Sequence, residues 1–175
     1  NDLEPILKEN GIEGCVAVQA EESTGENDFL LKLAAENAFI RGVVGWIDML
    51  DENMPQVLEQ YRDDKKMKGF RYVLQDKPSR DLMLAPVFKN NLSYFNRHRF
   101  TYDILIFRDQ LLFADELAKQ FSNQPLVLDH LGKPAVKMKE LQQWKRDITA
   151  LAKNENVFCK LSGLVTEADW HHFTE

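Results

Sequence analysis

Residues 126–131, Leu-Val-Leu-Asp-His-Leu, join an apolar run of strand length to an aspartate and a histidine at its carboxyl end. A run that is apolar on both sides is typical of a parallel strand buried on both faces. Similar β-branched or apolar runs recur along the chain, and several of them also end in polar residues. The six runs are Gly14–Gln19, Arg41–Asp48, Gly69–Leu74, Tyr102–Phe107, Leu126–Leu131 and Val157–Leu164.

Segments with helical periodicity separate these runs. Apolar residues recur at helical spacing within 29–34, 111–118 and 141–152, and a further helix is expected over Leu3–Lys8. Each run begins roughly 25–33 residues after the previous one, which is the size of a strand–helix–strand step. Strands that alternate with helices build a parallel sheet covered on both faces. The sequence therefore predicts the α/β class.

The strand ends favour a barrel over an open sheet. An open doubly wound sheet usually carries a glycine-rich phosphate loop after its first strand, whereas here the first run leads into Gln19-Ala20-Glu21-Glu22. Polar residues at many strand ends are typical of a (β/α)8 TIM barrel, whose active site lies at that face. Six strands are visible instead of eight, so we expect residues 1–175 to be a single partial barrel domain, containing about strands 2 to 7 and truncated at both ends.

Composition narrows the function classes. A net charge of −6 argues against a nucleic-acid partner, because phosphate binding requires a basic surface. No apolar run approaches the roughly 20 residues of a membrane span, and no signal peptide is evident. Cys15 and Cys159 lie in apolar runs, which predicts buried free thiols in a reducing, cytoplasmic location, with a disulfide between the two strands as the alternative. The first and last strands would form open sheet edges, so association into a homo-oligomer is a further expectation.

Several blocks of the sequence together resemble one family. The most specific are Asp129–Pro134, Asp-His-Leu-Gly-Lys-Pro, and Lys160–Leu164, Lys-Leu-Ser-Gly-Leu; Gly42–Asp48 and Lys68–Arg71 fit in order before them. The chain is similar over essentially its whole length to the amidohydrolase-related TIM-barrel hydrolases, and within them to the group of sugar-lactone hydrolases typified by L-fuconolactone hydrolase.

The resemblance implies a metal-assisted hydrolase with part of its site outside this chain. Members of the group carry a His-x-His pair on the first barrel strand and an Asp on the eighth, and neither is present here. His130 resembles the family histidine of the sixth strand, which implies a catalytic role, as a ligand of a divalent metal (zinc or manganese) or in contact with substrate. The alternative is a histidine hydrogen-bonded into the barrel rim. Asp129 has the opposite strand parity and is expected to point away from the barrel.

Two strands carry basic candidates for substrate binding. Arg71 can clamp a carboxylate or polarise a carbonyl, or it can form a salt bridge to a strand-end acid such as Asp48 or Asp103. Lys160 and Ser162 share one face of the last strand, and an inward orientation is expected because an outward lysine would be buried beneath a helix.

Further candidates lie at other strand ends. Gln19 and Trp46 are expected to form pocket walls, since an aromatic face stacks well on a sugar ring, although a barrel tryptophan is as often packed in the core. Asp48 is expected to bind substrate at the end of the second run. Asp103 is placed near the start of its strand, toward the amino-end face, although a strand that begins earlier would bring it into the site.

Three functions are consistent with these residues. The first is hydrolysis of a sugar lactone or a related cyclic ester, with a small-molecule substrate and a divalent metal. The second is amide hydrolysis or decarboxylation on the same scaffold, because a fold does not fix its chemistry. The third is a non-catalytic structural piece that needs the rest of the barrel.

Overall fold

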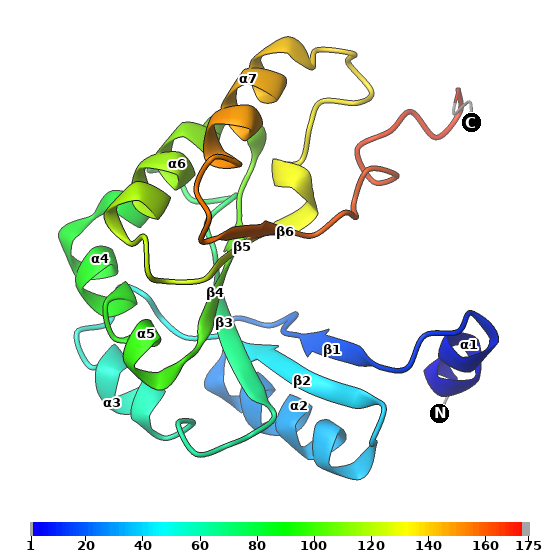
Figure 1. Ribbon diagram of the computed structural model, residues 1–175, viewed down its shortest axis with the longest axis vertical. Coiled ribbons are helices and arrows are strands. Elements are labelled where there is room, and N and C mark those ends of the chain that lie inside the picture. The colour runs from blue at the N-terminus through cyan, green and yellow to red at the C-terminus, as the bar shows by residue number, and fades with distance from the viewer. Residues whose placement is uncertain (1, 173–175) are drawn as a thin grey trace.

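Six parallel strands form one curled sheet in the computed structural model, which describes residues 2–172 (Figure 1). Neighbours in the sheet follow the order of the chain, and each pair is parallel. The strands are β1 (Cys15–Val18), β2 (Ile40–Gly45), β3 (Met67–Val73), β4 (Thr101–Leu105), β5 (Leu126–Leu128) and β6 (Val157–Cys159). The predicted α/β class and the incomplete TIM barrel are confirmed.

Helices cover the outer, convex face of this sheet, except for the first one, which lies apart beyond β1, and the inner face stays open (Figure 1). Short 3₁₀ turns, η1 (Leu82–Leu84), η2 (Arg108–Gln110) and η3 (Asp129–Gly132), lie in the loops after β3, β4 and β5. The α-helices are α1 (Leu3–Glu9), α2 (Thr24–Glu36), α3 (Met54–Glu59), α4 (Pro86–Leu92), α5 (Phe95–His98), α6 (Leu111–Gln120) and α7 (Gln142–Leu151). None of the helices within residues 2–172 is long and apolar enough to cross a bilayer.

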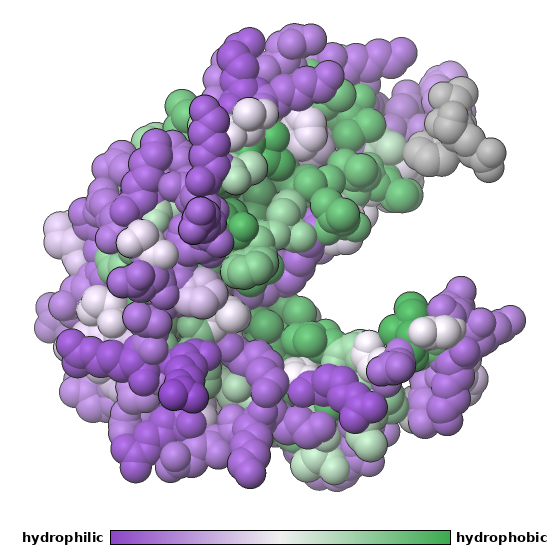
Figure 2. Space-filling model, viewed as in Figure 1, coloured by the Kyte–Doolittle hydropathy of each residue, from purple (hydrophilic) through white to green (hydrophobic). Residues whose placement is uncertain are grey.

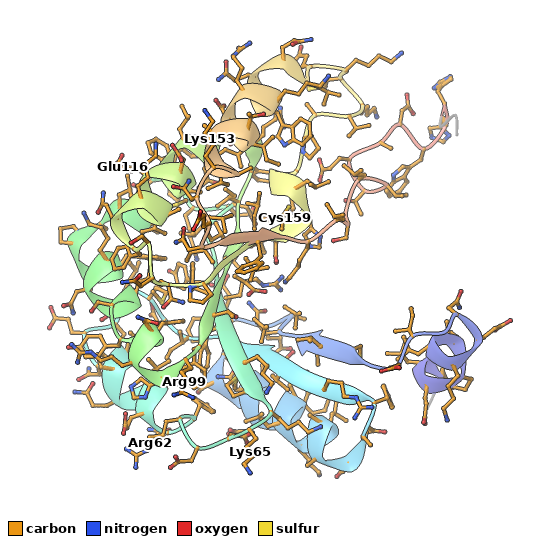
Figure 3. The ribbon with its side chains drawn as sticks, in the orientation of Figure 1. Arg62, Lys65, Arg99, Glu116, Lys153 and Cys159 are labelled. Atoms are coloured by element: carbon orange, nitrogen blue, oxygen red, sulfur yellow. The ribbon has the colours of Figure 1, made fainter. Side chains whose placement is uncertain are left out.

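The hydrophobic core lies between the sheet and its helices. Phe70 of β3 is fully buried there, with its ring 5.9 Å from that of Phe95 and 5.2 Å from that of Phe100, both edge to face. Strand alternation sends Arg71 to the other face. Figure 2 shows the resulting C-shaped molecule, with apolar side chains gathered along the walls of its notch. The labelled charged residues of Figure 3, such as Arg62 and Lys153, are exposed on the outer surface.

Most strands end earlier than the sequence predicts, and β5 and β6 are shortened most. β5 ends at Leu128 instead of Leu131, because His130 and Leu131 have φ of 52° and 57°, which a strand cannot accommodate. β6 ends at Cys159 instead of Leu164. Both cysteines are free, but neither is buried as predicted: Cys159 is exposed on the edge strand β6 and Cys15 is half-buried on the other edge.

Replacing Phe70 by alanine tests whether the core lies between the sheet and its helices. We expect Phe70→Ala to lower the free energy of unfolding of the whole protein by about 3–5 kcal/mol, because it empties a packed aromatic site. The matched control is Phe29→Ala on α2, where the phenylalanine is 55% exposed and the change should be small. Urea unfolding followed by circular dichroism measures both, and equal losses would contradict this account of the core.

Candidate active site

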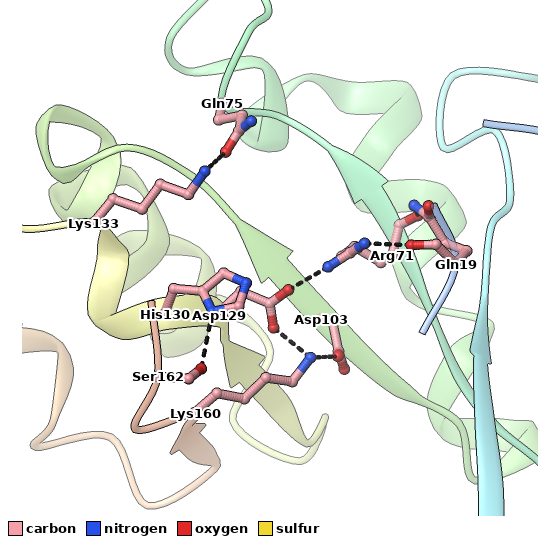
Figure 4. Close-up of polar contacts among 9 residues, drawn as sticks. All are labelled: Gln19, Arg71, Gln75, Asp103, Asp129, His130, Lys133, Lys160 and Ser162. Carbon is pink, nitrogen blue, oxygen red and sulfur yellow. Dashed lines mark hydrogen bonds and ion pairs between the residues drawn. The ribbon is translucent and has the colours of Figure 1, made fainter. Parts of the chain in front are cut away.

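A buried aspartate joins two cations on the inner face of the sheet. Asp129, directly after β5, accepts a hydrogen bond of 2.7 Å at Oδ2 from Arg71 Nη1 of β3. Its other oxygen, Oδ1, lies 2.5 Å from Lys160 Nζ, an ion pair without hydrogen-bond geometry. Lys160, directly after β6, also donates to Asp103 Oδ2 of β4 at 2.5 Å. Figure 4 shows these side chains converging from β3, from β4 and from the segments that directly follow β5 and β6.

The cluster balances its own charge in a poorly hydrated setting. It contains two cations and two carboxylates, and the side chains of Asp129 and Asp103 are only 0% and 2% exposed. Burial raises the pKa of Asp103, and the charge of Lys160 opposes this rise. Arg71 is also anchored through Nη2, which donates to the backbone carbonyl of Gln19 at 2.5 Å. These contacts fix the cations in place while leaving Lys160 and Arg71 with further N–H groups.

His130 is held beside this cluster by contacts from two directions. Its Nδ1 lies 2.9 Å from Ser162 Oγ, in the loop after β6. Gly163 has a φ of 75°, and a Cβ at this position would come within 2.7 Å of His130 Cβ, so only glycine allows this approach. On the other side, Trp144 of α7 donates from Nε1 to the carbonyl of Leu131 at 2.7 Å. The left-handed turn that carries the imidazole is therefore fixed by α7 and by the loop after β6.

Burial lowers the pKa of His130, and the nearby positive charges of Lys160, Lys133 and Arg71 lower it further, against the opposing effect of Asp129. The imidazole is therefore neutral at neutral pH. Since Nδ1 is engaged by Ser162, Nε2 is the ring nitrogen left to accept or donate a proton.

His130 and the cations line a cavity of about 560 Å³ on the inner face. This volume suits a small organic ligand, with apolar walls and a few polar groups. The lining residues are Val16, Val18, Val44, Lys68, Arg71, Thr101, Asp103, Val127, His130 and Lys160.

The structure brings some of the predicted residues together and leaves others apart. Arg71, Lys160 and His130 line the cavity, whereas Ser162 contacts the imidazole instead. Gln19 is buried and supports Arg71 through its backbone.

Trp46 and Asp48 do not line this cavity. Trp46 stacks on Tyr72 with ring centroids 6.4 Å apart, and Asp48 accepts a bond of 2.9 Å from the Leu50 amide. The reason is that β2 ends at Gly45, so strand alternation no longer directs the residues beyond it.

One orientation inferred from the sequence is wrong. Arg71 forms a salt bridge to a strand-end acid, one of the two alternatives left open, and this acid is Asp129 instead of Asp48 or Asp103. Asp129 does not point away from the barrel: it shares the parity of Val127, which lines the cavity, whereas His130 lies in the left-handed turn where alternation has ceased. Counting from Val127 would have found this. Asp103 lies in mid-strand, because β4 begins one residue earlier than predicted, and it does join the site.

A complete metal site is not formed by the residues that the structure describes. Within 2–172 there is no group of three or more His, Cys, Asp or Glu side chains arranged to hold a metal ion. Asp129 and Asp103 are engaged by Arg71 and Lys160, which leaves His130 as a single candidate ligand. This part of the chain alone therefore does not fit a catalytic metal.

Comparison with known proteins gives consistent matches. The model of the amidohydrolase family matches residues 2–175. The L-fucono-1,5-lactonase of Burkholderia multivorans is 35% identical over 174 residues, which cover 96% of this chain and 58% of that protein. The L-fucono-1,5-lactonase of Burkholderia ambifaria is 32% identical over 170 residues, covering 97% and 59%. The chain thus spans about three-fifths of the length of these relatives.

Solved structures agree with these matches. An amidohydrolase from Burkholderia multivorans, crystallised with bound zinc, superimposes with a TM-score of 0.90 at 35% identity, over 97% of this chain and 60% of that one. A probable 2-pyrone-4,6-dicarboxylic acid hydrolase from Acinetobacter baumannii gives a TM-score of 0.75 at 15% identity, over 97% and 61%, and shares the fold.

Removing the charge of Asp129 should destabilise the whole protein. We expect Asp129→Asn to cost about 3–5 kcal/mol, because it leaves Arg71 and Lys160 without their shared counter-charge in a buried site. The control is Asp109→Asn, which breaks a pair with Arg80 whose aspartate is 56% exposed and which should cost about 1 kcal/mol or less. Urea unfolding distinguishes the two, and similar losses would show that the buried cluster does not depend on Asp129.

The ring of His130 should titrate below its ordinary pKa of 6.5 in the metal-free whole protein. Between the folded pKa and 6.5 the unfolded chain binds more protons, so stability falls as the pH drops through this window. NMR titration of the ring measures the pKa directly, and His130→Gln identifies the resonance. The same variant should lose less stability than the wild type between about pH 7.5 and pH 5.5. A His130 pKa above 6.5 would contradict the described environment.

Proposed function

The chain belongs to the amidohydrolase family, and from this premise we propose that the whole protein is a hydrolase that opens a sugar lactone or a related cyclic ester. The juxtaposition of His130 with Lys160 and Arg71 around one cavity carries the proposal. The names of the two Burkholderia relatives support the lactone as the substrate class. Because the chain spans only part of their length, the proposal concerns the whole protein.

Lactone opening needs a base, a stabiliser for the carbonyl oxygen and an acid for the leaving alkoxide. A neutral His130 can serve as the base through Nε2, since its lowered pKa keeps this nitrogen available. Lys160 and Arg71 are already oriented by Asp129, and their remaining N–H groups can donate to the oxygen on which negative charge develops.

Water, His130 and the two cations are sufficient for the complete hydrolysis. His130 Nε2 takes a proton from water as the water oxygen forms a bond to the carbonyl carbon. The tetrahedral oxyanion accepts hydrogen bonds from Lys160 or Arg71. The ring C–O bond then breaks, and the proton on His130 passes to the leaving alkoxide, giving a hydroxy acid. Ser162 holds Nδ1 throughout and thereby keeps the imidazole in one orientation.

A divalent metal stays a prediction for the whole protein. Zinc is bound in the structure of the Burkholderia multivorans amidohydrolase. In this chain His130 is the residue that would offer a ligand atom, with the other ligands supplied from outside the described residues, and the steps above do not depend on it. Trp46, Asp48 and Gln19 likewise stay predictions as substrate-binding residues.

The test is acid release from sugar lactones by the whole protein, measured in a pH-stat with and without added zinc or manganese. We expect turnover that falls at least about 100-fold in His130→Gln, because the base is lost. The matched control is His98→Gln on α5, where the histidine pairs with Glu59 at 3.3 Å and does not line the cavity. Release of carbon dioxide without lactone opening would favour a decarboxylase, and unchanged turnover in His130→Gln would overturn the assigned role.

A further inference from the structure

Lys77, Arg80 and Lys133 lie on the loops that follow β3 and β5, and they differ in whether a carboxylate pairs with them. Lys77 Nζ lies 3.4 Å from Glu22, and Arg80 forms two bonds of 2.7 Å with Asp109. Lys133, which directly follows the η3 turn that carries His130, has no carboxylate within 4.0 Å in the part of the chain that the structure describes. Its ammonium contacts the neutral side chain of Gln75, whose Oε1 accepts its hydrogen bond.

Lys133 is nevertheless held in one place. Gln75 Nε2 donates to Asp76 at 2.9 Å, which turns its carbonyl oxygen toward the lysine. Lys133 Nζ also lies 5.2 Å from the centre of the Phe107 ring, a cation–π distance. The backbone of Lys133 has a φ of 52°, and the Lys133 amide donates a hydrogen bond of 2.9 Å to the His130 carbonyl. A half-buried lysine fixed at both ends loses the mobility that usually makes surface lysines poor binding groups.

The position of Lys133 connects this cation to the candidate site. It follows the η3 turn that carries His130, and its side chain extends to the loop after β3 at the rim beyond the strand ends (Figure 4). Its charge is among those that lower the pKa of His130, so the two groups share one electrostatic environment. Lys160 and Arg71 are paired with Asp103 and Asp129, whereas Lys133 has no acidic partner among the described residues. Lys68 also lacks one, but it lies near the amino end of β3, away from the rim, and its Nζ donates to the Lys65 carbonyl at 2.6 Å.

We propose that Lys133, positioned by Gln75 and Phe107, forms a subsite for a carboxylate group of the ligand. The inference rests on the proposed function, because lactone opening creates a carboxylate. The carboxylate has two possible sources, the newly formed acid of the product or a substituent already present on the lactone. In both, the ammonium donates a charge-assisted hydrogen bond.

Binding to the whole protein tests the subsite, with a sugar acid and its matched neutral sugar alcohol as probes in calorimetric titrations. Lys133→Met should weaken binding of the acid about tenfold and leave the alcohol unchanged, because one charge-assisted hydrogen bond is lost. Lys137→Met, an exposed lysine in the same loop, is the matched control and should change neither. Gln75→Glu should also weaken binding of the acid, since it gives Lys133 an acidic partner without removing the lysine.

Kinetics distinguish the two sources. If Lys133→Met raises the inhibition constant of the product acid but leaves the KM of a neutral lactone unchanged, the product carboxylate occupies the subsite. If Lys133→Met raises KM only for a lactone that carries a carboxylate, the carboxylate substituent of the lactone occupies the subsite. Unchanged binding of the acid in both Lys133→Met and Gln75→Glu would overturn the proposal. Absence of lactone turnover would refute the proposed function alone, because the titrations do not require turnover.

Discussion

The carboxylate of Asp129 is the constraint on which the candidate site depends. An isolated carboxylate without contact to water would cost many kcal/mol, so its burial requires cations on both of its oxygens. Arg71 and Lys160 meet this need from strands on either side of β5, and Asp103 in turn holds Lys160. The positions of four side chains thus follow from one buried charge. Such a cluster adds little net stability, but it orders donor groups before any ligand arrives.

The second constraint is the turn after β5. Two successive non-glycine residues, His130 and Leu131, adopt left-handed backbone, which costs about 1–3 kcal/mol each and persists only where the surroundings enforce it. Trp144 provides one restraint by bonding the Leu131 carbonyl, and the close approach of Gly163 to His130 provides another. This left-handed turn directs the imidazole toward the cavity and the Lys133 side chain toward Gln75. Backbone strain here coincides with the residues to which we assign function.

The sequence was sufficient for the class of fold because strand length, helical spacing and strand-end polarity are local signals. It also located His130, Arg71 and Lys160 at one face, since all parallel strands end on the same side. Orientation was harder to predict. Alternation failed at His130 and at Trp46, because β5 and β2 end before these residues, and counting parity back from His130 gave the wrong orientation for Asp129. The pairing of Arg71 with Asp129 joins residues 58 positions apart and depends on the curl of the sheet, which no local pattern records.

Whether a cation has a carboxylate partner determines which kind of ligand charge it can stabilise. Arg71 and Lys160 are paired with carboxylates, so they present oriented N–H groups but little net electric field. Such groups stabilise negative charge that develops during a reaction, and they do not attract anions beforehand. Lys133 has a neutral partner, so its field extends over roughly the 8 Å allowed by physiological screening. A neutral lactone and an anionic acid would therefore interact differently with the two parts of the site. The lactone would be recognised mainly by the neutral cluster beside His130, and a carboxylate by the uncompensated charge at the rim.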